Sequence, residues 1–245
     1  MKMQFFGPLA DRALLSKSVE DAVVDAIQTK KLEPGTKLPS ELELCEQFGV
    51  SRTVVREALR VLHARGLIDI QKGKGMFVRE FSGQSAADPL RFYLRMNFER
   101  SYVMDIVHAR QILEPAVVAL ASKKRTKDDV AQMAHDIDLL KTCADDFAEL
   151  SRIDTQFHID IAKASGNALM PLLLEPIHRL IPEIKSTVYA TVQEARDSAV
   201  LWHQKILDEI VKSDPDAARR AMVEHLRIAE EHAERMLRAS SKTAD

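Results

Sequence analysis

The stretch Leu38-Pro-Ser-Glu-Leu-Glu-Leu-Cys-Glu-Gln-Phe-Gly-Val-Ser-Arg-Thr-Val-Val-Arg-Glu-Ala-Leu59 predicts two helices joined by a tight turn. Ser40 and Glu43 have the spacing of a capping box, which opens the first helix, and Gly49 is suited to end it. Ser51 can cap the second helix through its side-chain oxygen. Two helices linked by so short a turn are typical of a helix-turn-helix unit.

The segments on both sides of this stretch complete the unit. Apolar residues recur with a helical period between Ser16 and Lys31, upstream of the two helices. Downstream, short strands are expected at 67–70 and 76–79, and Lys72-Gly-Lys-Gly75 gives their hairpin a basic tip. Helix, short helix, turn, helix and hairpin together predict a winged helix-turn-helix domain.

Basic residues are concentrated in this part of the chain. The whole sequence has 35 basic and 37 acidic residues, a net charge of −2, which excludes a uniformly basic coat for nucleic acid. Residues 51–79 nevertheless carry seven basic and two acidic side chains. A helix fits the major groove and its first turns reach base edges, which is where Arg52 and Arg56 lie. Arg60 is explained equally well by a surface pair with Glu57. We therefore expect double-stranded DNA to bind here.

The overall composition favours a mainly α protein. Apolar residues make up 46% of the chain, while only 8 Gly and 9 Pro are available for turns. Two cysteines, Cys45 and Cys143, are too few for a disulfide framework and indicate a reducing compartment. No apolar run approaches the roughly 20 residues that span a bilayer. The sequence thus predicts a cytoplasmic protein without membrane contact.

A change in composition divides the chain into two domains. The segment 81–87 is small, polar and without periodicity, so it reads as a linker. We expect the DNA-binding domain at 12–80 and an all-helical bundle at 88–240. Pro115 is predicted to kink or break its helix. Helices of the bundle are expected at 99–122, 127–143, 146–164, 168–191, 193–212 and 215–239.

Polar residues on the predicted bundle helices have the spacing of metal ligands. Asp154 and His158 are four residues apart and so share one helix face, while His203 and His225 lie on two other helices. One carboxylate and three imidazoles suit a divalent transition metal, although each histidine alone could be a buried, hydrogen-bonded side chain. His232 could be a rival ligand, seven residues after His225. The other histidines do not join this set by spacing: His63, His108, His135 and His178.

Most of the segment 14–80 resembles the DNA-binding domain of the GntR family of bacterial transcription regulators. The resemblance rests on the stretch 38–59, on Gly66-Leu67 and on Gly73-Lys-Gly75. Leu42 departs from the family, which often has a basic residue there, so the operator is expected to differ from the commonest half-site. By resemblance, DNA contacts fall in the recognition helix and at the wing tip, on Ser51, Arg52, Thr53, Val54, Arg56, Lys72 and Gly73.

The second half resembles the FCD ligand-binding domain of the FadR subfamily. The similar segments are Asp154-Thr-Gln-Phe-His158, Ser165-Gly-Asn167, His203-Gln-Lys-Ile-Leu207 and Met222-Val-Glu-His-Leu226. The resemblance implies that the aspartate and the three histidines of these segments hold zinc, nickel or a similar ion, and that a small carboxylate effector completes the coordination.

Arg110 falls where the FCD domain has a pocket arginine. A guanidinium can bind a carboxylate through two parallel hydrogen bonds, so Arg110 is the predicted effector ligand. A salt bridge to Glu114, four residues later on the same helix, is the alternative.

These features together predict a homodimeric transcription regulator that responds to a small organic acid, and not an enzyme. One alternative is a metal-dependent hydrolase or lyase in the helical domain, although the sequence contains no nucleophile motif and no separate general base at suitable spacing. A second alternative is a regulator for which the metal ion itself is the signal.

Overall fold

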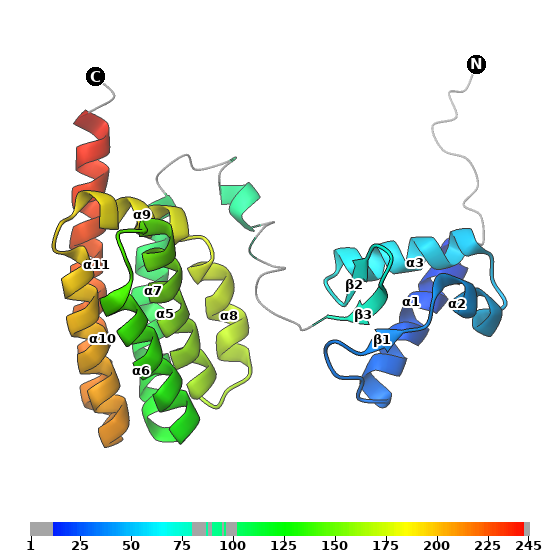
Figure 1. Cartoon of the computed structure of the whole chain (residues 1–245), viewed down its shortest axis with the longest axis horizontal. Helices are drawn as coiled ribbons and strands as arrows, with labels where there is room; N and C mark the ends of the chain where they lie inside the picture. Colours follow the sequence, from blue (N-terminus) through cyan, green and yellow to red (C-terminus); the bar gives the residue numbers. More distant parts are fainter. Residues whose placement is uncertain (1–11, 80–86, 88–89, 95, 97–101, 243–245) are drawn as a thin grey trace, which may run out of the picture. The chain divides into compact units, whose positions relative to one another are not determined.

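The structure is a computed structural model that describes residues 12–79, 87, 90–94, 96 and 102–242. The chain divides into two compact units, Met1–Phe81 and Ser82–Asp245, each of which is described by itself. The linker predicted at 81–87 lies outside the described residues except for Ala87. Figure 1 shows short helices and a small sheet in the N-terminal unit and a bundle of long helices in the C-terminal unit.

The N-terminal unit is the predicted winged helix-turn-helix. Three strands form an antiparallel sheet in the order β1-β3-β2, in which Leu38 pairs with Met76 and Ile68 with Val78. The strand β1 was not predicted, whereas β2 and β3 lie within one residue of the expected hairpin. The elements in chain order are α1 (Arg12–Thr29), β1 (Lys37–Leu38), α2 (Glu41–Phe48), α3 (Arg52–Ala64), β2 (Ile68–Gln71) and β3 (Gly75–Val78).

The predicted caps fix the ends of α2 and the start of α3. The Ser40 hydroxyl accepts a hydrogen bond from the Glu43 amide at 3.3 Å, and the Glu43 carboxylate accepts one from the Ser40 amide at 2.6 Å. Gly49 ends α2 with φ 64°, a left-handed conformation that glycine adopts without strain. Ser51 then caps α3 through the Val54 amide. These local bonds set the short turn that separates the two helices.

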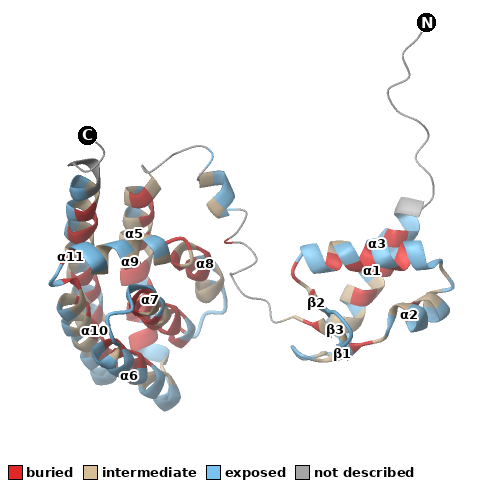
Figure 2. Cartoon of the chain, turned by 45° about the horizontal axis from the view of Figure 1, so that its top comes forward, coloured by how far each residue is buried: buried red, intermediate tan, exposed pale blue. Residues whose placement is uncertain are grey.

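The C-terminal unit contains seven described long helices. Figure 2 shows that their buried faces point inward and their exposed faces outward. The longest, α11, packs along α5 and α10. In chain order the helices are α5 (Tyr102–Lys124), α6 (Lys127–Thr142), α7 (Phe147–Ala164), α8 (Leu169–His178), α9 (Pro182–Thr191), α10 (Ala195–Lys212) and α11 (Pro215–Lys242).

The structure differs from the expectations at two places that contain proline: there is no break at Pro115, and residues 168–191 do not form one continuous helix. Pro115 does not break its helix, because α5 continues through it from Tyr102 to Lys124. The single helix expected at 168–191 is divided into α8 and α9, and Pro182 occupies the first turn of α9. Proline is favoured at that position, because the amide it lacks has no partner in the first turn of a helix.

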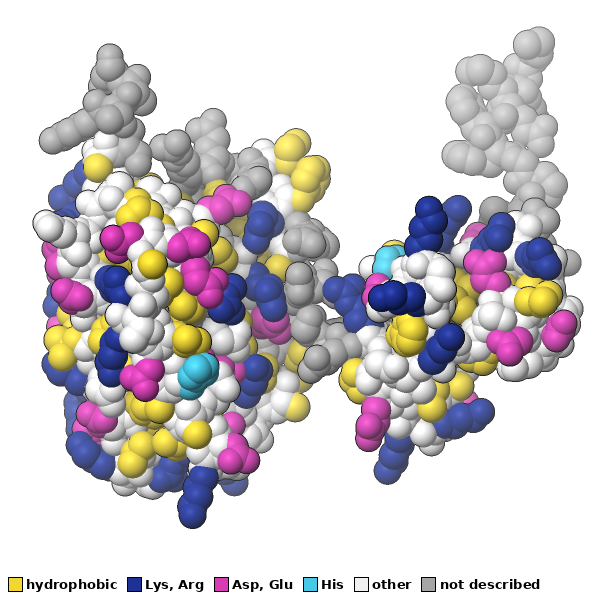
Figure 3. Space-filling view, in the orientation of Figure 1, with side chains coloured by type: hydrophobic (Ala, Val, Ile, Leu, Met, Phe, Trp, Pro, Cys, Tyr) yellow, Lys and Arg dark blue, Asp and Glu magenta, His cyan; other side chains and the backbone are white. Residues whose placement is uncertain are grey.

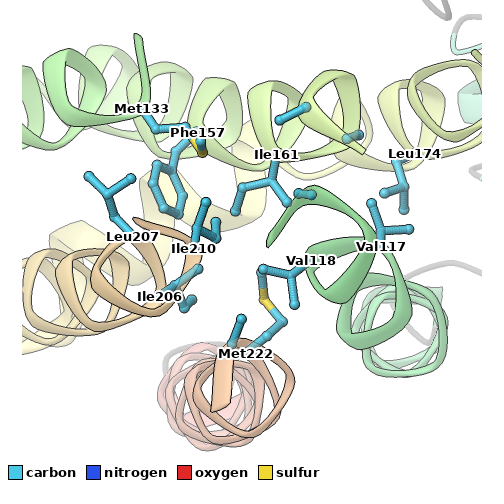
Figure 4. Packing of buried hydrophobic residues seen from close by; sticks show 14 of the residues in the cluster. Val117, Val118, Met133, Phe157, Ile161, Leu174, Ile206, Leu207, Ile210 and Met222 are labelled. Atoms are coloured by element: carbon cyan, nitrogen blue, oxygen red, sulfur yellow. The ribbon is translucent and has the colours of Figure 1, made fainter. Parts of the chain in front are cut away.

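The apolar core of the bundle joins most of its helices. Figure 4 shows Phe157 of α7 facing Ile206 and Ile210 of α10, with Met222 of α11 and Val118 of α5 nearby. Phe157 is only 1% exposed. Its ring stacks on the imidazole of His203, with the two ring centroids 4.0 Å apart. The core therefore continues directly into the polar centre of the bundle.

A pair of buried carboxyl groups lies between α6 and α7. Asp136 and Asp160 are 3% and 5% exposed and border a cleft of about 580 Å³. One oxygen of Asp136 accepts a hydrogen bond from Gln132, and one of Asp160 accepts from Gln156 and Lys163. The second oxygen of each carboxyl has no hydrogen-bond partner within the described part of the chain. Burial and the neighbouring Asp160 raise the pKa of Asp136 to about 7.

Replacing Asp136 should change how stability depends on pH. Because its pKa is raised from the ordinary 3.8, the folded chain holds more protons than the unfolded chain between pH 4 and pH 7. Stability therefore falls as the pH rises through this window. Relative to Asp136→Asn, the wild type should lose about 2–3 kcal/mol between pH 5 and pH 8, measured by urea unfolding. Asp138→Asn, at an exposed position of α6, is the control, and parallel profiles for wild type and Asp136→Asn would contradict the expectation.

Candidate functional site

The N-terminal unit presents basic side chains at the start of α3 and at the tip of the hairpin. Arg52, Arg56, Lys72 and Gly73 are all exposed, as are Ser51 and Thr53. In Figure 3, Lys and Arg side chains, drawn dark blue, are spread over the visible face of this unit. The recognition helix therefore offers its first two turns to a partner of negative charge.

Val54 requires a correction. It is 3% exposed and belongs to the apolar core of the unit, beside Val55 and Leu59. Its side chain stabilises the packing of α3 and is not available to DNA. Successive residues of a helix point in different directions around its axis. Val54 and Val55 therefore face the core although Arg52, just before them, is exposed.

Arg56 has an acidic neighbour that the sequence analysis did not anticipate. Its Nε donates a hydrogen bond to the Glu41 carboxylate of α2 at 2.8 Å, and both side chains are exposed. Within the described ranges, no ion pair reaches Arg52 or Arg60, so the expected pair between Arg60 and Glu57 is not formed there. The contact with Glu41 leaves the terminal nitrogen atoms of Arg56 free for another acceptor.

The four predicted metal ligands converge at the centre of the helical bundle. Asp154 and His158 come from α7, His203 from α10 and His225 from α11, and all four are at most 6% exposed. The ligand nitrogen atoms of the three histidines lie within 4.8 Å of one another. Asp154 Oδ1 is 3.2 Å from His203 Nε2 and 3.6 Å from His158 Nε2. The four side chains therefore meet at one place, which the sequence alone could not show.

Glu114 of α5 orients the imidazole of His158. Its Oε2 lies 2.5 Å from His158 Nδ1. Burial alone would raise the pKa of Glu114, but Arg110 and His158 outweigh that effect and hold the pKa well below its usual value. Because an ionised carboxylate only accepts hydrogen bonds, His158 Nδ1 carries the proton and Nε2 presents a lone pair.

Two side chains of α9 hold Asp154 in a similar way. The Tyr189 hydroxyl donates to Asp154 Oδ2 at 2.9 Å, and Lys185 Nζ lies 2.5 Å from the same oxygen. Burial lowers the pKa of Lys185 to about 8, opposed by Asp154. Burial would raise the pKa of Asp154, but the charge of Lys185 and the neighbouring imidazoles of His158 and His203 keep it well below its usual value. Oδ1 of an ionised Asp154 is thus turned towards the imidazoles.

The donor atoms are suited to a divalent cation. His203 Nε2 and Asp154 Oδ1 have no hydrogen-bond partner with suitable geometry among the described residues. Burial lowers the pKa of His203 to about 4 and that of His225 well below its usual value. His158 Nε2 lies 3.3 Å from both Arg110 Nη2 and His225 Nε2, contacts that a bound ion would replace. Imidazole nitrogens and one carboxylate are ligands that zinc and related ions prefer. The residues present therefore fit a transition metal.

Sequence reasoning missed the surroundings of these ligands. Lys185 and Tyr189 lie one turn apart on α9, so their spacing predicts that they share a helix face. The spacing does not show that this face packs against Asp154. His178 of α8, set aside by its spacing, has Nε2 at 3.2 Å from Glu114 Oε1 and its ring stacked on His158. His232 lines the neighbouring cavity and is absent from the ligand groups found in the described part of the chain.

Arg110 takes part in the salt bridge that was its alternative role. Its Nε donates to Glu114 Oε1 at 2.6 Å, and both side chains are buried. Arg110 also lines a cavity of about 70 Å³, together with Asp154, Lys185 and His225. Its Nη2 lies 3.3 Å from His158 Nε2, and the guanidinium has further N–H groups that are compatible with contact to a bound molecule.

Both units match models of known families. Residues 15–78 match the model "Bacterial regulatory proteins, gntR family", and residues 105–228 match "FCD domain". The chain belongs to the GntR family of bacterial regulatory proteins. It is a DNA-binding transcriptional regulator with a C-terminal FCD domain. No helix within the described residues has the length and apolar character that a membrane span requires.

Other GntR regulators are similar over most of the chain. The "Putative L-lactate dehydrogenase operon regulatory protein" of Escherichia coli (strain K12) is 32% identical, covering 86% of this chain and 83% of that protein. LutR of Bacillus subtilis (strain 168) is 31% identical, covering 82% and 92%. The solved structure of Streptococcus agalactiae GntR is 27% identical, with a TM-score of 0.72 and coverage of 88% and 99%. The first of these is named as an operon regulatory protein and the second as a transcriptional regulator.

Removing the charge of Glu114 should weaken metal binding. In Glu114→Gln the acceptor for His158 Nδ1 loses its charge, so the imidazole becomes a poorer ligand. The affinity for zinc should fall about 10–100-fold, measured by competition with a chromophoric chelator. Glu209→Gln on α10 removes a carboxylate that pairs only with Lys212 among the described residues and serves as control. Equal zinc affinity in both variants would show that Glu114 does not orient the ligand.

Proposed function

We propose that this GntR regulator binds operator DNA as a homodimer and that a small organic acid, bound next to a divalent metal ion in the FCD unit, modulates that binding. The observation that carries the proposal is the convergence of Asp154, His158, His203 and His225 beside a cavity that Arg110 also lines. We assign DNA binding to residues 12–80, and effector binding and dimerisation to 88–240. As a regulator that acts on DNA, it works in the cytoplasm.

The DNA contacts follow from exposure and charge in the N-terminal unit. Arg52 and Arg56 can each form two hydrogen bonds with the O6 and N7 atoms of guanine in the major groove. Ser51 and Thr53 are placed to bind phosphate at the start of α3, where amide groups also favour an anion. Lys72 and Gly73 at the wing tip would contact the minor groove or its backbone. In a homodimer, two recognition helices about 34 Å apart would read a near-palindromic site.

Charge balance supports an acid as the effector. Without a metal, the carboxylates of Asp154 and Glu114 are matched by the two cations Arg110 and Lys185. A divalent ion adds two positive charges to this buried centre. Buried charges are costly unless they are compensated, so an anion is the favoured ligand of the loaded site. Zinc is the expected ion, with nickel or a similar ion as the alternative.

Effector control requires that the acid binds one state of the dimer more tightly than the other. The name of one relative refers to an L-lactate dehydrogenase operon, which is consistent with control by a carboxylic acid. A metal-sensing regulator would instead respond to chelation alone. Operator binding measured with metal removed and with acid added separates these possibilities.

Loss of either recognition-helix arginine should weaken specific DNA binding. Arg52→Ala or Arg56→Ala should cost about 1–3 kcal/mol of operator affinity if the residue reads a guanine. Fluorescence anisotropy at fixed salt, with operator and unrelated DNA, measures the effect. Arg65→Ala, at the opposite end of α3, should have a smaller and sequence-independent effect. Wild-type operator affinity in both variants would contradict the assignment of the recognition helix.

Removing a metal ligand should abolish both the metal and the response. His203→Ala should lower the bound metal measured by elemental analysis, because one imidazole ligand is lost. The same variant should no longer change its operator affinity when the acid is added. His135→Ala, an exposed histidine of α6, is the matched control. A full metal load in His203→Ala would remove that residue from the site.

A further inference from the structure

Lys185 is the second cation of the cavity and was not anticipated from the sequence. Its side chain is 11% exposed, and it lies on α9 with Nζ facing Asp154 Oδ2. It lines the same cavity as Arg110, which comes from α5 on another wall. An ammonium group has three N–H donors, and within the described residues the only ion pair of Nζ is the one with Asp154, so donors remain for a bound anion. Two cations thus border one small space.

Asp154 does not depend on Lys185 alone. Its Oδ2 also accepts the hydrogen bond from the Tyr189 hydroxyl, so the carboxylate stays oriented if the ammonium turns away. A bound metal ion would draw on the negative charge of Asp154 and so weaken its attraction for Lys185. In that state the ammonium is available to another anion. A lysine is well suited to this task because it is a compact charge on a flexible stem.

The size and lining of the cavity limit the anion. Its volume is about 70 Å³, whereas an engineered cavity that accepts benzene measures about 150 Å³. Apart from the charged end, its walls are mainly aliphatic, with Val107, Ile184 and Val188 among them. The other polar side chains that line it are Tyr189, Ser198 and His232. The space suits an acid of about two to four carbon atoms with a short apolar tail, and is too small for a six-carbon sugar acid.

We propose that Lys185 and Arg110 together hold the carboxylate of a short-chain monocarboxylic acid, and that the aliphatic wall restricts the effector to acids of this size. The inference rests on the proposed function, because it concerns the effector of the same metal-containing unit. It adds a specificity-determining lysine and a size limit that the family resemblance does not supply.

The test uses the full chain loaded with zinc and titrated with L-lactate or D-glucuronate in a calorimeter. The wild type should bind L-lactate about tenfold or more tightly than D-glucuronate. Lys185→Met should weaken L-lactate binding by about tenfold or more without loss of zinc, because it removes a buried charge that contacts the carboxylate. Lys185→Gln gives the same comparison if the methionine variant does not fold. Tyr189→Phe, which removes a hydrogen bond to Asp154 but no charge, should bind L-lactate more tightly than either lysine variant.

Each result has a separate meaning. Wild-type affinity for L-lactate in the lysine variants would overturn the role of Lys185. Loss of zinc in those variants, with unchanged L-lactate affinity in the fraction that keeps zinc, would show that Lys185 only orients Asp154. Equal binding of D-glucuronate and L-lactate would overturn the size limit while the proposed function stands. If neither acid binds the zinc-loaded wild type and neither acid changes its affinity for operator DNA, the proposed function fails together with this inference.

Discussion

The structure of the helical unit depends on the mutual compensation of charges buried at its centre. Asp154 and Glu114 are each at most 5% exposed, and each faces a buried cation, Lys185 or Arg110. An isolated carboxylate in such a place would cost several kcal/mol. The pair of Lys185 and Asp154 joins α9 to α7, and the contact of Glu114 with His158 joins α5 to α7. Arg110 and Glu114 lie on the same helix, so their pair compensates charge within α5. The position of the imidazoles follows from that arrangement.

The two units show different kinds of dependence on local sequence. In the N-terminal unit, Ser40, Glu43, Gly49 and Ser51 determine the ends of α2 and the start of α3 through bonds to residues two to four positions away. In the helical unit, the decisive contacts join distant parts of the chain, such as Glu114 with His158 and Tyr189 with Asp154. The first unit is therefore specified by short motifs, and the second by packing.

That difference explains how much could be predicted. The caps and apolar periods of the chain were sufficient for the winged helix-turn-helix and for most helices of the bundle. The four metal-ligand candidates were found because their spacing matched a known domain. Lys185, Tyr189 and His178 were missed, because only the packing of α8 and α9 against α7 brings them to Asp154 and Glu114. The burial of Val54 was missed for a related reason, since the boundary between two helix faces depends on what packs there.

The donor atoms of the polar centre all belong to helices that the apolar core holds in place. Phe157 links the two directly, since it precedes His158 in the chain and stacks on His203. A loop can move to accommodate ions of different radius, but α7, α10 and α11 cannot do so without repacking the side chains in Figure 4. Evolution of this centre is therefore tied to evolution of the core: a change of preferred ion would require compensating changes in apolar residues one or two helical turns from the ligands.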